Sequence, residues 1–203
     1  MINQKPIHVA VVLAAGSSSR MGQPKQLLQM GNESLIRKIV KETIASGCDK
    51  VFVVLGSNRV RVENEIKDLP IEIVFNEDWN KGMGSSIKCG LNQAMKISQI
   101  ESIVFILCDQ PRLNSFHLGK LKEEHRHSQF PIIASRYADS IGVPALFHKS
   151  VFQKLETIED TSGAKKIIEQ NPALVKSVDF PEGEIDLDTP EDWKKFIQGI
   201  SKL

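Results

Sequence analysis

Two basic side chains follow a short glycine- and serine-rich turn near the start of the chain. The turn Gly16-Ser-Ser-Ser comes directly after an apolar run at residues 9–15 and leads to Arg20 and Lys25. Small residues let a ligand approach the main-chain N–H groups, and a guanidinium beside an ammonium suits an anion with several oxygens. The segment therefore predicts a polyphosphate-binding loop. An ordinary turn with two solvated cations is the alternative, and the spacing does not match a Walker A motif.

A carboxylate at the end of another apolar run is a candidate metal ligand. Asp109 follows the run at residues 103–108, and a proline comes two positions later. Mg²⁺ prefers one or two protein carboxylates together with water and phosphate oxygens. Asp186 and Asp188 could supply a partner, but in an extended segment they point to opposite sides, so only one of them easily faces a metal. An Asx turn is the alternative interpretation of Asp109.

The segment Lys81-Gly-Met-Gly-Ser-Ser-Ile87 places small residues at the expected start of a helix. Gly82 and Gly84 are not followed by the third glycine of the dinucleotide fingerprint, so the segment is a weak signal for NAD. Small residues permit close approach of a ribose, and a helix N-terminus favours phosphate. A serine-capped helix start is the alternative. Trp79, just upstream, is expected to pack rather than to stack on a base.

The hydrophobic pattern predicts the scaffold that must position these residues. Short apolar runs indicate strands at residues 8–15, 50–55, 71–75, 102–108, 131–135, 145–147 and 174–178. Helical periodicity indicates helices at residues 34–46 and 83–95, and Thr189 can cap a last helix that begins at Pro190, with Asp192 near the capping-box position.

The alternation of strands and helices over the first half predicts right-handed crossovers. We therefore expect an α/β protein: a Rossmann-like three-layer α/β/α sandwich with a mostly parallel sheet. Ligands of such sheets bind beyond the carboxyl ends of the strands. The loop at residues 16–25 and Asp109 should consequently meet at one edge of the sheet.

Bulk composition fits a compact enzyme. With 203 residues the chain is long enough to bury about 70% of its unfolded surface, and no linker is visible, so residues 1–203 are expected to form a single domain. The net charge of +1 gives no field that would attract nucleic acid or an anionic membrane. Three widely spaced cysteines in apolar surroundings indicate a reducing compartment, and no signal peptide or spanning segment is visible, so we expect a cytoplasmic protein.

Together, these motifs resemble the MobA/MocA-like nucleotidyltransferases. Residues 13–25 fit the pattern Leu-Ala-Ala-Gly-x-Ser-x-Arg-Met-Gly-x-x-Lys. Further segments that are similar to the family follow in its order: Asn76-Glu-Asp-Trp-Asn-Lys-Gly-Met-Gly-Ser-Ser-Ile87, Leu107-Cys-Asp-Gln-Pro111, Gly142-Val-Pro-Ala-Leu-Phe147, Ser162-Gly-Ala-Lys165 and Asp186-Leu-Asp-Thr-Pro-Glu-Asp-Trp193. The Cys-Asp-Gln-Pro and Asp-x-Asp-Thr-Pro elements resemble the molybdopterin cytidylyltransferase branch.

This resemblance implies a fold like that of the nucleotide-diphospho-sugar transferases. It implies transfer of CMP from CTP to a phosphorylated acceptor, in the first place molybdopterin or molybdenum cofactor, with release of pyrophosphate. Mg²⁺ is implied as the cofactor, held by Asp109 and Asp188 with Asp186 as the alternative, and Arg20, Lys25 and Asp109 are implied to be catalytic. Nucleotide contacts are implied for Leu13, Ala14, Ala15, Gly16, Ser17, Ser18, Arg20, Lys25, Gly82, Ser85 and Ser86.

Several functional alternatives remain open at the level of sequence. The nucleotide could be another nucleoside triphosphate, and the acceptor could be a sugar or alditol phosphate; a molybdenum hydroxylase is a candidate partner. A non-catalytic protein that binds molybdenum cofactor is an alternative from another class. Arg20, Lys25 and Asp109 argue against it, because a carrier need not neutralise a departing pyrophosphate. A nicotinamide-dependent oxidoreductase is the last alternative.

Overall fold

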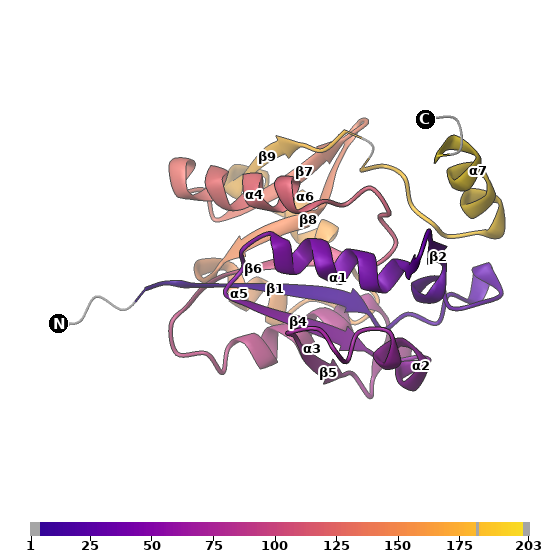
Figure 1. The fold of residues 1–203 in the computed structure, drawn as a ribbon. Helices are drawn as coiled ribbons and strands as arrows, with labels where there is room; N and C mark the ends of the chain where they lie inside the picture. Colours follow the sequence, from indigo (N-terminus) through magenta and orange to yellow (C-terminus); the bar gives the residue numbers. More distant parts are fainter. Residues whose placement is uncertain (1–4, 182, 201–203) are drawn as a thin grey trace.

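A seven-stranded sheet crosses the protein in the order β5-β4-β1-β6-β8-β7-β9 (Figure 1). The computed structural model describes residues 5–181 and 183–200. The strands of this sheet are β1 (Ile7–Ala14), β4 (Lys50–Leu55), β5 (Glu72–Phe75), β6 (Ile100–Leu107), β7 (Ile132–Tyr137), β8 (Ser140–His148) and β9 (Val175–Asp179). Only β8 runs against its neighbours β6 and β7, and the other strands of the sheet share one direction. The predicted mostly parallel sheet is confirmed.

Helices cover both faces of the sheet and complete three layers (Figure 1). On one face lie α1 (Leu35–Ala45), α2 (Arg59–Asn64), α4 (Ser115–Ser128) and α7 (Pro190–Ile200). On the other lie α3 (Met83–Ala94), α5 (Phe152–Glu156) and α6 (Ala164–Gln170). Short elements join them: η1 (Ser19–Met21), η2 (Lys25–Leu27), β2 (Gln29–Met30), β3 (Glu33–Ser34), η3 (Trp79–Lys81), η4 (Lys149–Val151) and η5 (Pro172–Leu174).

The central strand β1 shows why this sequence folds into layers. Its side chains alternate between two apolar clusters: Val9, Val11 and Leu13 pack with α3, whereas Ala10 and Val12 pack with α1. A strand buried on both faces is expected to be a continuous apolar run, which is what the sequence contains. The carboxyl end of β1 is thereby held in the middle of the sheet, next to that of β6.

The seven predicted strands are all present, but the direction of β8 was not predicted. The run predicted at residues 145–147 is the end of a longer strand that forms an antiparallel hairpin with β7. The helices α2, α4, α5 and α6 and the small antiparallel pair β2–β3 were not predicted either. In the described part of the chain, no helix has the length and hydropathy needed to cross a bilayer.

The predicted cap of the last helix is confirmed. The main-chain N–H of Thr189 donates to Asp192 Oδ2 at 2.9 Å, and the N–H of Asp192 donates to Thr189 Oγ1 at 3.2 Å. This reciprocal pair is a capping box, and Pro190 occupies the first helical position. The cap fixes where α7 begins, and therefore where the preceding Asp188 lies.

Candidate active site

The loop predicted to bind polyphosphate leaves the carboxyl end of β1 and folds back through η1 and η2. Ser18 and Gly22 have left-handed backbone angles, with φ of 56° and 72°, and these two residues turn the chain sharply. The main-chain N–H of Lys25 donates to Ser18 Oγ at 3.0 Å, which closes the loop. Lys25 is thereby directed back toward the end of the sheet.

Lys25 lies between two carboxylates. Its Nζ is 2.6 Å from Asp109 Oδ2 and 3.1 Å from Asp188 Oδ1. Arg20 Nη2 is 3.0 Å from the other oxygen of Asp188, Oδ2. The side chains of Lys25 and Asp109 are only 17% and 15% exposed, whereas Arg20 is 74% exposed. The two predicted cations and the two predicted metal ligands therefore form one network of alternating charge.

Two different parts of the fold bring these carboxylates together. Asp109 follows β6, the neighbour of β1 in the sheet. Asp188 comes from the segment before α7, and the main-chain N–H of Leu187 ties this segment to the Asp109 carbonyl oxygen at 3.1 Å. The alternative metal ligand, Asp186, lies in the same segment but has no ion pair to either cation. Asp188 therefore shares Lys25 with Asp109 in the charged network.

Burial and neighbouring charges together shift the pKa values of Lys25 and Asp186. Burial alone would lower the pKa of the Lys25 ammonium, but the Asp109 charge and hydrogen bonds to Asp109 and Asp188 outweigh burial and raise it. Asp186 is exposed as a residue, yet loss of hydration at its carboxyl group, followed by repulsion from Asp109 and Asp188, raises its pKa to about 7. Lys25 therefore stays charged, and three carboxylates lie within electrostatic reach of one another.

One oxygen of this network has no protein partner. Asp109 Oδ1 is buried and accepts no hydrogen bond from the described residues, whereas Oδ2 is held by Lys25. A buried carboxylate oxygen without a donor is costly unless a cation or water satisfies it. Within the described part of the chain, no group of three or more histidine, cysteine, aspartate or glutamate side chains is arranged to hold a metal ion.

A cavity of about 300 Å³ opens beside Lys25 and Asp109. It is lined by Leu13, Ala14, Ala15, Gly16, Ser17, Lys25, Gln26, Trp79, Asn80, Gly82, Met83, Ser86, Leu107, Cys108 and Asp109. Most of the residues implied to contact the nucleotide are among them. Arg20 adjoins through its ion pair with Asp188, and Ser18 acts inside the loop rather than on the cavity wall.

The glycine segment meets the cavity through a close contact of two main chains. The N–H of Gly84 donates to the carbonyl oxygen of Asp160 at 2.8 Å, and a Cβ on Gly82 would overlap that carbonyl. Ser86 lines the cavity, but Ser85 does not: its hydroxyl lies 2.8 Å from the carbonyl oxygen of Gly82 and 2.8 Å from the Asn76 amide. Gly82 and Ser86 therefore line the cavity, while Ser85 stabilises the start of α3.

We expect Gly82→Ala to destabilise the protein. Gly82 has a φ of 129°, which alanine rarely adopts, and the added methyl group would collide with Asp160. The free energy of unfolding should fall by about 1–3 kcal/mol in chemical denaturation. The matched control is Gly119→Ala in α4, where a Cβ meets no atom within 4 Å, so stability should be unchanged or should rise by up to about 1 kcal/mol. A Gly82→Ala protein as stable as the wild type would contradict the packing described here.

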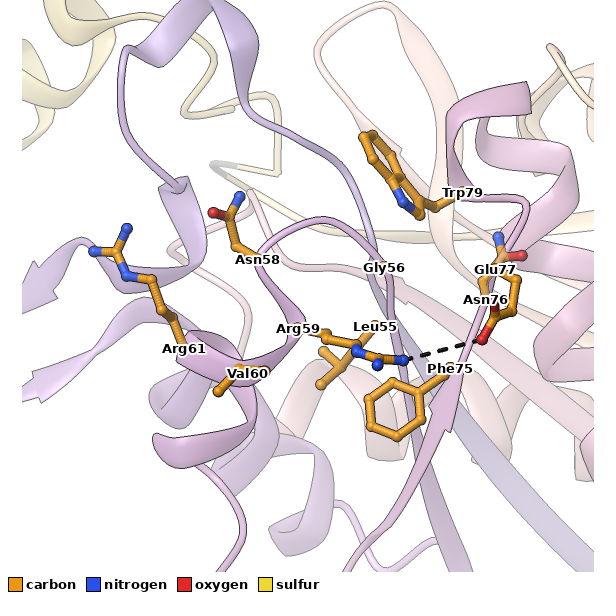
Figure 2. A pocket seen from close by; sticks show the side chains of 10 residues that line it. All are labelled: Leu55, Gly56, Asn58, Arg59, Val60, Arg61, Phe75, Asn76, Glu77 and Trp79. Carbon is orange, nitrogen blue, oxygen red and sulfur yellow. Dashed lines mark ion pairs between the residues drawn. The ribbon is translucent and has the colours of Figure 1, made fainter.

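A second cavity, of about 460 Å³, lies at the ends of β4 and β5. Figure 2 shows the side chains that line it. The Cζ atom of Arg59 lies 4.9 Å from the centroid of the Phe75 ring, and its Nη1 atom lies 4.0 Å from Glu77 Oε1. Trp79 lines this cavity as well as the first one. Gly56 makes the arrangement possible, since a Cβ there would overlap the Trp79 side chain. Trp79 packs against the core as predicted, and it is also a wall shared by two cavities.

The first cavity, beside Lys25 and Asp109, is also lined by residues that the sequence did not single out. Met83 lies within the glycine segment Lys81–Ile87 and Asn80 directly precedes it, so their place in the sequence was the available signal. Gln26 is only 1% exposed, although it follows the exposed loop. The sequence indicates this burial only weakly, because a glutamine before two leucines fits a surface position as well as a buried one.

The protein is thus a mostly parallel α/β sandwich whose first strand ends in a loop carrying two cations, opposite a pair of carboxylates. Residues 10–175 match the MobA-like NTP transferase domain. The chain belongs to this family, which confirms the resemblance stated above.

Known relatives carry different names. The nicotine blue oxidoreductase of Paenarthrobacter nicotinovorans is 32% identical, over 95% of this chain and 97% of its own. The molybdenum cofactor guanylyltransferase of Syntrophotalea carbinolica is 29% identical, over 76% of this chain and 68% of its own. The crystal structure of Rv0371c from Mycobacterium tuberculosis superposes with a TM-score of 0.85 at 26% identity, over 96% of this chain and 99% of that one. A complex of Rv0371c with manganese has also been solved, with a TM-score of 0.80 at 25% identity over 95% and 98% of the two chains.

Proposed function

We propose that this protein transfers CMP from CTP to a phosphorylated acceptor, in the first place molybdopterin or molybdenum cofactor, and releases pyrophosphate. One observation carries the proposal: Lys25 and Asp109 belong both to the charged network and to the wall of the cavity built by the family signature. A nucleotide in that cavity would have its phosphates beside the two cations and the two carboxylates.

The loop supplies the groups that a triphosphate needs. Gly16 and Ser17 line the cavity, so their main chain can approach phosphate oxygens closely. Lys25 and Arg20 would move from the carboxylates to the phosphates and offset the charge that builds on the departing pyrophosphate. The acceptor phosphate is largely ionised near neutral pH, so no strong general base is required, and the protein acts by positioning and charge neutralisation.

We propose Asp109 and Asp188 as the ligands of Mg²⁺. The buried Asp109 Oδ1 without a protein donor fits a cation, and two carboxylates suffice for Mg²⁺ when phosphate and water complete its shell. The manganese complex of Rv0371c supports a divalent cation in this fold family. When bound, such an ion polarises phosphate oxygens and neutralises their charge.

The base and the acceptor are the finer parts of the proposal. Cytosine rests on the Cys-Asp-Gln-Pro and Asp-x-Asp-Thr-Pro motifs. The relative named molybdenum cofactor guanylyltransferase supports a molybdenum cofactor acceptor and makes GTP the alternative nucleotide. A sugar or alditol phosphate is the alternative acceptor. We further propose that residues 1–203 act as one domain in the cytoplasm and that a molybdenum hydroxylase receives the product.

A thermal-shift panel tests the class of ligand. Among CTP, GTP, ATP, UTP and NAD, CTP with Mg²⁺ is expected to stabilise the protein most. A ligand that binds only the folded state contributes about 2.7 kcal/mol at a hundredfold excess over its Kd, so the nucleotide that binds most tightly gives the largest shift. Pyrophosphate release from CTP should then require a phosphorylated acceptor. Greater stabilisation by GTP than by CTP would identify GTP as the nucleotide that is transferred. Stabilisation by NAD alone would contradict a transferase and favour an oxidoreductase, the name that the 32% identical relative carries.

A further inference from the structure

The Gln26 side chain is the buried link between η2 and the end of β1. Its amide Nε2 lies 3.0 Å from the carbonyl oxygen of Ala14 and 2.9 Å from that of Gly16. Its Oε1 accepts a hydrogen bond from Ser18 Oγ at 3.3 Å. Both amide donors and the amide acceptor are therefore directed at the loop. With 1% of its surface exposed, Gln26 forms these bonds where water cannot replace them easily.

These bonds determine the orientation of the peptide groups that line the cavity. In a trans peptide the N–H points opposite to the C=O, and the peptides of this loop are trans. Gln26 holds the carbonyls of Ala14 and Gly16, while the N–H of Ser57 holds the Ala15 carbonyl at 2.9 Å. The N–H of Ser17 therefore points away from Gln26 and cannot reorient without breaking the bond to Gly16.

The fixed N–H groups are free to bind a ligand. In the part of the chain that the structure describes, the N–H groups of Gly16 and Ser17 donate to no other main-chain oxygen. Both residues line the cavity beside Lys25. Consecutive main-chain N–H groups can together bind an anion, and such a site gains from being preorganised before the anion arrives.

We propose that Gln26 is a positioning residue for the nucleotide phosphates. It touches the loop carbonyls and not the reacting atoms, and it acts by holding the peptide between Gly16 and Ser17, so that the Ser17 N–H keeps the orientation that a phosphate oxygen requires. This inference rests on the proposed function, since it assumes that the cavity binds a nucleoside triphosphate. It differs from a purely structural role, in which Gln26 would stabilise the fold without affecting catalysis by the folded enzyme.

Gln26→Met tests the inference, because methionine has a similar length but no amide. We expect kcat/KM for the nucleotide to fall about 100-fold, since a small misplacement of binding groups costs that much. The nucleotide Kd should rise about tenfold by calorimetry, while KM for the acceptor stays within about twofold. The matched control is Gln29→Met: Gln29 is exposed, and its amide reaches only the Leu27 carbonyl, at 3.4 Å, so its kinetics should equal those of the wild type.

The outcomes separate the role of Gln26 from the proposed function. A folded Gln26→Met enzyme with a lower melting temperature but unchanged kcat and KM would overturn the positioning role. A wild-type protein that neither binds nor turns over any nucleotide would overturn the proposed function, and this inference with it. If Gln26→Met does not fold, Gln26→Asn undergoes the same assays, because its shorter amide cannot reach both carbonyls; wild-type kinetics in that variant would also overturn the role.

Discussion

Replacement of Asp109 by asparagine is expected to lower nucleotide transfer about 1,000-fold. The change keeps the size of the side chain but removes the charge that Lys25 contacts at 2.6 Å and the oxygen proposed to hold Mg²⁺. The loss should appear in kcat rather than in KM for the acceptor, because the charge acts on the transferring phosphate. Pyrophosphate release, measured at saturating nucleotide and acceptor, gives the rate, and circular dichroism verifies the fold.

The neighbouring aspartates provide graded controls for this experiment. Asp188→Asn should resemble Asp109→Asn, since Asp188 pairs with both cations. Asp186→Asn should have a much smaller effect, because Asp186 contacts neither cation in an ion pair. Asp139→Asn, at an exposed turn, should leave the rate unchanged. Full activity of Asp109→Asn, or a greater loss in Asp186→Asn than in Asp188→Asn, would contradict the assignment of the carboxylates.

Lys25→Met is expected to lower kcat/KM for the nucleotide about 100-fold and, at the same time, to increase the affinity for Mg²⁺ alone. The first effect follows from the loss of a buried cation beside the phosphates. The second follows because Lys25 occupies Asp109 and Asp188 in the ligand-free protein, so that a metal must displace its ammonium. Titration calorimetry with Mg²⁺, with and without CTP, measures both affinities.

The comparison with Arg20 separates the two effects of Lys25. Arg20 is exposed and reaches only Asp188, so Arg20→Met should increase the Mg²⁺ affinity less than Lys25→Met does. Lys5→Met removes a cation paired with Asp49 and should change neither measurement. Weaker Mg²⁺ binding by Lys25→Met in the absence of nucleotide would show that Lys25 does not compete with the metal.

The sequence predicts most of the sheet because most of its strands contain a short apolar run. Residues of β1 pack into the apolar clusters on both faces of the sheet, so positions 9–14 of the strand are all apolar. Such a run can be recognised without knowing which strands or helices pack against it. The meeting of the Lys25 loop with Asp109 was predictable for the same reason, since both follow strands and strand ends share an edge. The structure places them in contact, while their catalytic roles stay proposals.

Features that depend on how segments of the chain pack against one another were not predictable. The reversed direction of β8 follows from its hairpin with β7, which an apolar run of three residues does not reveal. The contact between Gly84 and Asp160 joins segments with no common pattern, so the glycines indicated only that something approaches closely. Gln26 was missed because its burial depends on carbonyls of a loop that the sequence predicted to face a ligand.

The hydrogen bond from the Leu187 N–H to the Asp109 carbonyl joins a late segment of the chain to the sheet, and this affects the order in which the site assembles during synthesis. Every strand of the central sheet precedes Asp188 in the chain, and domains begin to fold while synthesis continues. The layers around β1 can therefore assemble while the segment carrying Asp188 is still being made. During that interval a nascent chain has the loop and Asp109 but lacks both Asp188 and the α7 helix that follows it, so the sheet forms before the charged network is complete.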